Sequence, residues 1–178
     1  MKKIIFPLIA VFIVTLSAFT LKTAQNWKIA DGYSIKFTSD DPSGIFSDLK
    51  GTITFDEKNL SASKFDVTID VNSINTGNGM QNNHAKSAQW FDAEKYPLIK
   101  FTSKTISKTS SGYEAQGILE MHGVQKEFTL PFSIEKSGNG LVFKSTFDAN
   151  RNDWKIGEPG KKASDIMKME ISVPVTAS

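Results

Sequence analysis

The main pattern in this chain is an alternation of apolar and polar residues that recurs from residue 33 to the C-terminus. In its clearest stretch, polar residues separate Phe65, Val67, Ile69 and Val71. A period of two places these four side chains on one face of a half-buried β-strand, because successive strand side chains point to opposite faces. The same alternation marks seven further segments: 33–37, 49–55, 99–101, 113–121, 128–134, 141–147 and 167–175.

Turn-forming residues separate these segments, as in the stretches 40–44, 110–112 and 137–140. Strands with one apolar and one polar face are typical of antiparallel sheets, and short strands at regular spacing indicate a sandwich or a barrel. We therefore predict an all-β fold of about eight antiparallel strands. Pro131 and Pro174 occupy outward positions of two strands. Each marks an edge, a bulge or a strand end, since proline cannot donate to a strand ladder.

One segment, residues 80–91, breaks the alternation and contains no β-branched residue. It follows a glycine-rich turn, so we predict one or two helical turns here, between the third and fourth strands. This short helical insert would bring Met80, His84, Trp90 and Phe91 against the mouth of the β structure.

The N-terminal segment differs from the rest of the chain. Two lysines precede an uncharged, mostly apolar run, Ile4–Phe19, and small and polar residues follow. This layout is typical of a secretory signal peptide, and the run is shorter than a membrane-spanning helix requires, although a retained anchor is the alternative. We predict a signal peptide over 1–24, with Ala18 and Ala24 as candidate cleavage positions. We expect 25–178 to be a single periplasmic or secreted domain with no stable membrane span after cleavage.

Composition restricts the function further. A chain of 178 residues without cysteine can bury a sufficient core without disulfides, and it has no zinc–cysteine site, iron–sulfur cluster or thiol nucleophile. The whole chain has a formal net charge of +2, and three of its lysines lie in the leader. Without them the remaining domain is slightly acidic. A nucleic-acid-binding domain normally carries a basic patch. We therefore expect no cofactor and no nucleic-acid partner.

The sequence contains little that points to catalysis. Neither His84 nor His122 is paired with a nucleophile motif, and the G-x-S-x-G elbow is absent. The stretch that begins at Asp148 starts like a calcium-binding loop. It has Asp153 where that loop needs Gly and Pro159 where it needs Glu, so we predict no metal site. We predict no catalytic residue and no enzyme activity. The alternative is an isomerase or hydrolase that uses His84.

Phenylalanine is over-represented, with 13 Phe against 3 Tyr and 3 Trp. Ten Phe follow the leader, and eight of them occupy inward positions of predicted strands. A filled core, as in a ligand-free stress or interaction protein, would explain this distribution. An eight-stranded barrel can instead hold one small ligand, and an apolar lumen would bind a long apolar molecule by removing its surface from water. We predict that the ligand contacts Phe37, Phe55, Phe65, Val67, Ile69, His84, Trp90, Phe91, Phe101, Leu119, Phe128, Phe132, Phe143, Phe147 and Met169.

Several stretches carry a family likeness, and they follow one another from Trp27 to the C-terminus. They are Ser73–Thr76, His84 with Ser87, Trp90–Asp92, Tyr96–Ser103, Gly117–Lys126 and Asp148–Trp154. In this order they resemble the signature of the YceI-like lipid/polyisoprenoid-binding family.

The resemblance implies an extended lipocalin-like antiparallel barrel, export to the periplasm in many members, and an isoprenoid chain held in the lumen. It implies no catalytic residue. Members often carry an Arg–Asp pair before the helix histidine and Leu after it. This chain has Gln81, Asn82 and Ala85 there, so the side chains at the pocket mouth carry less charge and are shorter. We therefore predict an exported carrier or sequestering protein for an isoprenoid or other long-chain lipid. The sequence leaves a homodimer open.

Overall fold

The computed structural model describes residues 24–160 and 163–178, so the predicted signal peptide lies outside the described residues except for Ala24. Strands dominate these ranges, with one α-helix and three short 3₁₀ helices. Their bounds are β1 Asn26–Ile29, β2 Ser34–Thr38, β3 Gly44–Phe46, β4 Leu49–Thr54, η1 Leu60–Ala62, β5 Lys64–Asp70, η2 Val71–Ser73, β6 Ile74–Asn75, α1 Gly79–Lys86, β7 Leu98–Thr109, β8 Gly112–Met121, β9 Val124–Ser137, β10 Gly140–Asn150, η3 Arg151–Trp154 and β11 Ile166–Ala177.

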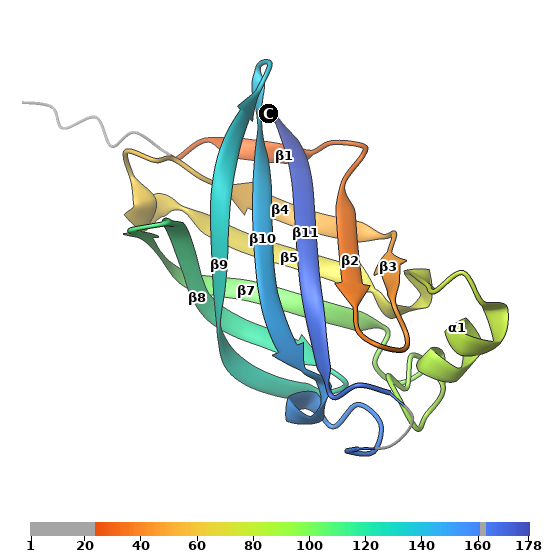
Figure 1. Ribbon diagram of the computed structural model, residues 1–178. Coiled ribbons are helices and arrows are strands. Elements are labelled where there is room, and N and C mark those ends of the chain that lie inside the picture. The colour runs from red at the N-terminus through yellow and green to blue at the C-terminus, as the bar shows by residue number, and fades with distance from the viewer. Residues whose placement is uncertain (1–23, 161–162) are drawn as a thin grey trace, which may run out of the picture.

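The strands form a closed antiparallel barrel, which confirms the predicted fold class (Figure 1). Around the barrel the order is β1-β4-β5-β7-β8-β9-β10-β11, and β1 pairs with β11 to close it. The short strands β2, β3 and β6 continue three of these strands toward the end that carries α1. For example, Ile29 of β1 faces Val175, and Ser34 of β2 faces Ser172 on the same partner strand.

Side-chain hydroxyl groups bridge the breaks in these interrupted strands. The Tyr33 hydroxyl donates to the Ser47 carbonyl at 2.8 Å and accepts the Leu49 N–H at 3.1 Å. The Ser73 hydroxyl accepts the Ser47 N–H at 3.1 Å. Backbone N–H and C=O groups that leave a strand ladder need other partners. These hydroxyls satisfy them where the regular ladder stops, so the barrel wall continues across the breaks.

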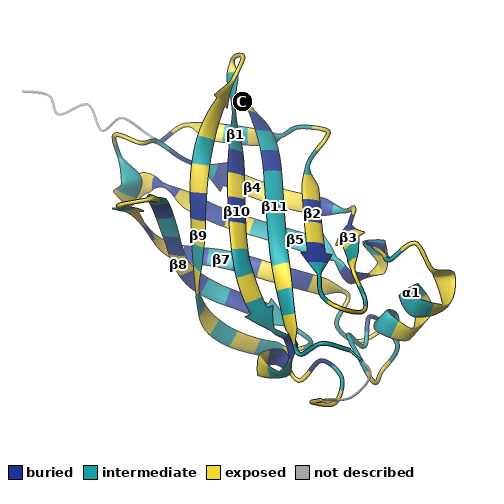
Figure 2. Cartoon of the chain, viewed as in Figure 1, coloured by how far each residue is buried: buried dark blue, intermediate teal, exposed yellow. Residues whose placement is uncertain are grey.

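Burial alternates along the strands, as the period of two predicts (Figure 2). In β2, Ile35 and Phe37 are buried while Ser34 and Lys36 are exposed. The inward side chains form one hydrophobic core that includes residues of every barrel strand. The outward residues are mostly polar, and many form exposed ion pairs such as Lys36 with Glu170.

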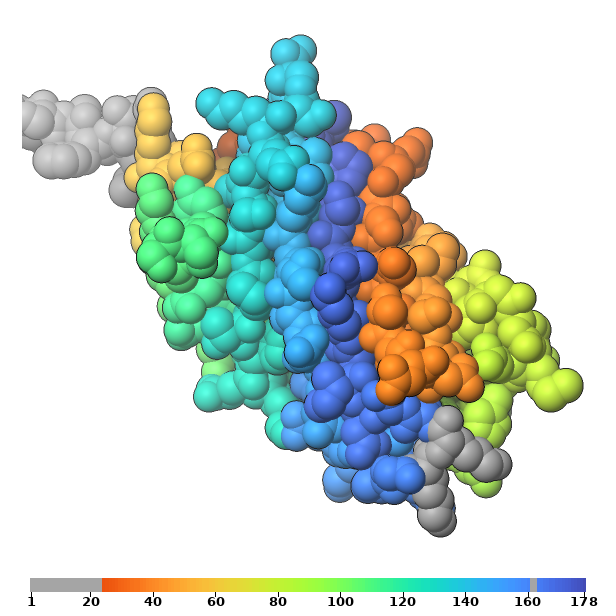
Figure 3. All heavy atoms as spheres, viewed as in Figure 1, coloured from red at the N-terminus to blue at the C-terminus, as the bar shows by residue number. Residues whose placement is uncertain are grey.

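The helix α1 confirms the predicted insert, but it is shorter than the predicted segment. Asn78 caps its first turn by accepting the backbone N–H groups of Met80 and Gln81. The helix ends at Lys86, because the chain then folds back into turns. In these turns the backbone N–H of Trp90 donates to the Ser87 carbonyl at 2.9 Å. In the space-filling view α1 lies beside β2 and β3 at one end of the barrel (Figure 3). Within the described ranges, no helix is long and apolar enough to cross a membrane.

The wall is interrupted between β9 and β10, which separate toward the η3 end (Figure 1). Their ladder joins Ser133–Ser137 to Gly140–Lys144. Beyond it, residues 124–132 pair with β8, and 145–150 pair with β11. Pro131 lies just past the last pair, where a ladder would need the N–H that proline lacks. Of the predicted alternatives (an edge, a bulge or a strand end), Pro131 thus lies at a local edge. We call the interruption the β9–β10 seam.

Candidate functional site

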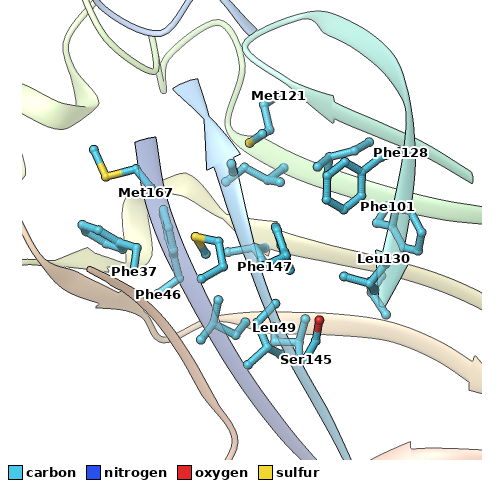
Figure 4. A pocket seen from close by; sticks show the side chains of 18 of the residues that line it. Phe37, Phe46, Leu49, Phe101, Met121, Phe128, Leu130, Ser145, Phe147 and Met167 are labelled. Atoms are coloured by element: carbon cyan, nitrogen blue, oxygen red, sulfur yellow. The ribbon is translucent and has the colours of Figure 1, made fainter. Parts of the chain in front are cut away.

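An apolar cavity of about 240 Å³ occupies part of the barrel interior (Figure 4). Its volume is just below the roughly 300–1,000 Å³ typical of small-molecule pockets. Its wall combines inward residues of the barrel strands with residues of α1, η3 and the loops beside them. The predicted residues that line it are Phe37, Phe65, Val67, Ile69, Trp90, Phe91, Phe101, Leu119, Phe128, Phe132, Phe143, Phe147 and Met169.

Phe55 was predicted to contact the ligand, but it does not line the cavity. Its side chain is fully inside the barrel at 1% exposure. Its ring packs edge-on against Tyr113, Phe132 and Phe143, with centroids 5.4, 6.0 and 5.5 Å away. Alternation therefore identified the correct face. It could not show that this position lies in the filled end of the barrel.

His84 also lies outside the cavity lining, although it was predicted at the pocket mouth. It is exposed on α1, and its Nε2 atom accepts the indole N–H of Trp90 at 2.6 Å. An indole nitrogen can only donate, so this bond requires the histidine proton to be on Nδ1. The hydrogen bond ties the imidazole to Trp90, and Trp90 itself forms part of the cavity wall.

The cavity also has wall residues that the sequence prediction omitted. Phe46, Met121, Leu130 and Met167 are among them (Figure 4). Leu130 shares the inward parity of Phe128 and Phe132, so alternation contained the signal that would have identified it. Arg151 and Trp154 lie on η3, outside any alternating strand, and no periodic signal pointed to them.

Arg151 holds the loop that borders the cavity at the η3 end. Its side chain is 4% exposed. Its guanidinium donates to the carbonyls of Ile156 at 2.6 Å, Glu158 at 2.9 Å and Ser164 at 3.0 Å, and to Asp165 Oδ1 at 2.7 Å. A buried charge is tolerated only when it is paired and hydrogen-bonded. The donors of Arg151 thus serve the fold of this loop.

Two neighbours complete this arrangement at the η3 end. The guanidinium of Arg151 lies 5.1 Å from the ring centre of Trp90, a cation–π distance. The Gly160 N–H and the Asn152 side chain hydrogen-bond to Asp165 and, with the nearby Arg151 charge, hold the pKa of its carboxyl below the ordinary value. Asp165 is therefore ionised at neutral pH and balances the arginine.

Polar groups of the wall are hydrogen-bonded to the protein itself. The Ser145 hydroxyl donates to the Pro131 carbonyl, and the Trp154 indole donates to the Leu119 carbonyl at 3.1 Å. In the described part of the chain, no three His, Asp or Glu side chains gather as a metal site would require. The cavity accordingly presents hydrocarbon to a guest, and a charged guest would lose hydration without finding a partner.

Comparison with known proteins identifies the family. Residues 20–175 match the model of the YceI-like domain. The chain belongs to the YceI-like family. This YceI-like chain is 34% identical over 136 residues to a UPF0312 protein of Yersinia enterocolitica, which covers 73% of this chain and 71% of the relative. It is 38% identical over 96 residues to Protein YceI of Salmonella arizonae, and that match spans 50% of the Salmonella protein.

Solved structures share the fold of this YceI-like protein. BcnA of Burkholderia cenocepacia has a TM-score of 0.78 at 22% identity, and the match covers 84% of this chain and 100% of BcnA. A polyisoprenoid binding domain from Saccharophagus degradans, implicated in plant cell wall breakdown, has a TM-score of 0.65 at 16% identity. The match covers 88% of this chain and 100% of that domain. At these identities the likeness establishes the shared barrel.

Proposed function

We propose that this YceI-like protein binds a long apolar lipid of the polyisoprenoid class in its barrel cavity and acts as an exported carrier or sequestering protein without catalysis. The observation that carries the proposal is the cavity wall, which consists of aromatic, methionine and aliphatic side chains, with its polar groups bonded to the protein. Burial of apolar surface contributes about 25 cal/mol per Å², so a long hydrocarbon chain gains most from this site.

The shape of the wall supports a flexible, branched chain. Phenylalanine rings form rigid faces, and Met121, Met167 and Met169 add side chains that adapt to irregular guests. The polyisoprenoid-binding domain from Saccharophagus degradans shares this barrel. Export rests on the signal-like pattern of residues 1–24.

The structure does not support the features on which the enzyme hypothesis and the ligand-free hypothesis depended. The enzyme hypothesis needed His84 in the pocket, whereas its ring lies outside the cavity lining and hydrogen-bonds to Trp90. The ligand-free hypothesis needed a filled interior, whereas the barrel contains a cavity of about 240 Å³.

The test begins with the protein expressed with its leader and purified from the exported fraction. Organic extraction followed by mass spectrometry should recover a polyprenyl lipid. Polyprenols added to the delipidated protein should raise Tm, because a ligand that binds only the native state stabilises it. At a hundredfold excess over Kd the gain is about 2.7 kcal/mol, or roughly 5–10 °C for a domain of this size.

A cavity-filling variant provides the matched control for this experiment. Ala149 lines the cavity, so Ala149→Phe should reduce or abolish the Tm shift. Ala88→Phe makes the same change on an exposed turn and should retain it. An empty exported protein with no polyprenol-induced shift would contradict the proposed function.

A further inference from the structure

The end of the cavity that lies away from η3 is closed by three aromatic rings. Along β10 the cavity residues run from Ala149 through Phe147 to Phe143, stepping away from η3. Phe143 meets Phe65 and Phe132 there, with ring centroids 5.6 and 5.9 Å away, and Phe65 lies 5.1 Å from Phe132. All three line the cavity and are buried. We call this triangle the aromatic floor.

A second layer of rings supports the aromatic floor from behind. Phe55 contacts both Phe132 and Phe143, and Tyr113 stacks on Phe132 with centroids 5.3 Å apart and an interplanar angle of 22°. Neither Phe55 nor Tyr113 lines the cavity, and both are buried. The Tyr113 hydroxyl donates to Glu57 Oε1 at 2.7 Å, which fixes its ring. Interiors packed in this way resist local displacement, so the cavity is blind at this end.

The opposite end of the cavity differs in chemistry. Trp90, Phe91, Arg151 and Ile156 border it there, beside α1 and the loop that Arg151 holds. A polar head group forced against the aromatic floor would lose its hydrogen bonds to water without replacement. A lipid with one polar end therefore enters with its tail first and keeps its head group near α1 and η3.

We propose that Phe65, Phe132 and Phe143 determine the length of the chain that the protein accepts, because the tail of the lipid ends against their rings. This inference rests on the proposed function. Replacing Phe143 by Ala removes a phenyl ring, whose size is about that of one isoprene unit, and leaves a cavity at the floor. The preferred chain should then be longer by one unit.

The experiment loads delipidated protein with an equimolar series of polyprenols of increasing length and identifies the retained chains by mass spectrometry. For Phe143→Ala the most abundant retained chain should be one isoprene unit longer than for wild type. Phe143→Trp should shift it to a shorter chain. Leu141→Ala shortens an apolar side chain on the same strand but outside the cavity lining, and it should leave the maximum unchanged.

The outcomes separate this inference from the proposed function. A wild type that retains no polyprenol of any length overturns the proposed function. A wild type that retains a defined set, with the same maximum in Phe143→Ala and Phe143→Trp, overturns the role of the floor. An equal lengthening in Leu141→Ala also overturns it. Should Phe143→Ala fail to fold, Phe143→Leu serves in its place, with an increased ratio of the next longer chain to the wild-type maximum as the expected result.

Discussion

Two phenylalanines that share inward parity should differ sharply in their contribution to stability. Phe55 lies in the filled end of the barrel at 1% exposure and contacts three other rings. Phe147 is half-buried and lines the cavity, and its ring centroid lies 5.1 Å from that of Phe128. Replacing each in turn by alanine removes the same group from these two surroundings.

The expected magnitudes follow from the atoms that each ring touches. Truncating a fully packed Phe to Ala costs about 3–5 kcal/mol, since transfer energy and new cavity surface add. Phe55→Ala should fall in this range. The ring of Phe147 already borders empty volume, so its removal enlarges an existing cavity and breaks fewer contacts. Phe147→Ala should therefore cost less than about 2 kcal/mol.

Urea denaturation of the delipidated proteins measures both values. Ligand must be absent, because a guest bound in the cavity would add its own contacts to Phe147. The corresponding fall in Tm should be roughly 6–20 °C for Phe55→Ala and below about 8 °C for Phe147→Ala. Equal losses of stability in the two variants would refute the division of the interior into a filled end and a hollow end.

Three further predictions concern the end of the barrel beside η3 and α1. Arg151→Met should lower the free energy of unfolding in urea by about 3 kcal/mol, because the loop carbonyls and Asp165 lose their hydrogen-bond donors. Arg151→Lys should not restore stability, since lysine lacks the planar fork of the guanidinium. Full stability in Arg151→Lys would contradict the role of the guanidinium. The folded pKa of Asp165 is lowered, so its contribution is present above the unfolded value near 3.9 and lost as the pH falls through the folded pKa. The stability difference between wild type and Asp165→Asn should thus shrink between pH 7 and pH 3, and a constant difference would contradict it. His84→Ala should keep the retained lipid within about twofold, as expected of an exposed residue; loss of the lipid would contradict the placement of His84 outside the binding site.

Alternation predicted the antiparallel strands because it records which face of a strand is buried, and the resemblance to the YceI-like family implied that they close into a barrel. It gave no information about position along the barrel axis. Phe55 and Phe143 have the same parity, yet Phe143 lines the cavity and Phe55 lies behind it. Depth depends on how strands from distant parts of the sequence are staggered, and a single strand does not encode that stagger.

The interrupted strands and the η3 end were also beyond the reach of pattern analysis. The break near Ser47 is stabilised by the hydroxyl of Tyr33, whose position is set by tertiary structure. The strand β1 has only four residues, too few for alternation to identify it. Arg151 reads in the sequence as an ordinary polar residue, because the carbonyls that surround it come from a loop that follows it.

The β9–β10 seam makes the wall of the barrel mechanically uneven. Below the last ladder pair, Phe128 of β9 and Phe147 of β10 touch across the seam with ring centroids 5.1 Å apart. Spreading the two strands at the seam separates apolar side chains and breaks the side-chain hydrogen bond from Ser145 to the Pro131 carbonyl. Spreading the paired strands elsewhere breaks a ladder of backbone hydrogen bonds. Apolar contacts adapt to a new neighbour by changing rotamer, while hydrogen bonds demand fixed geometry. The barrel is therefore most compliant along this line, and a guest bulkier than the resting cavity is accommodated there first.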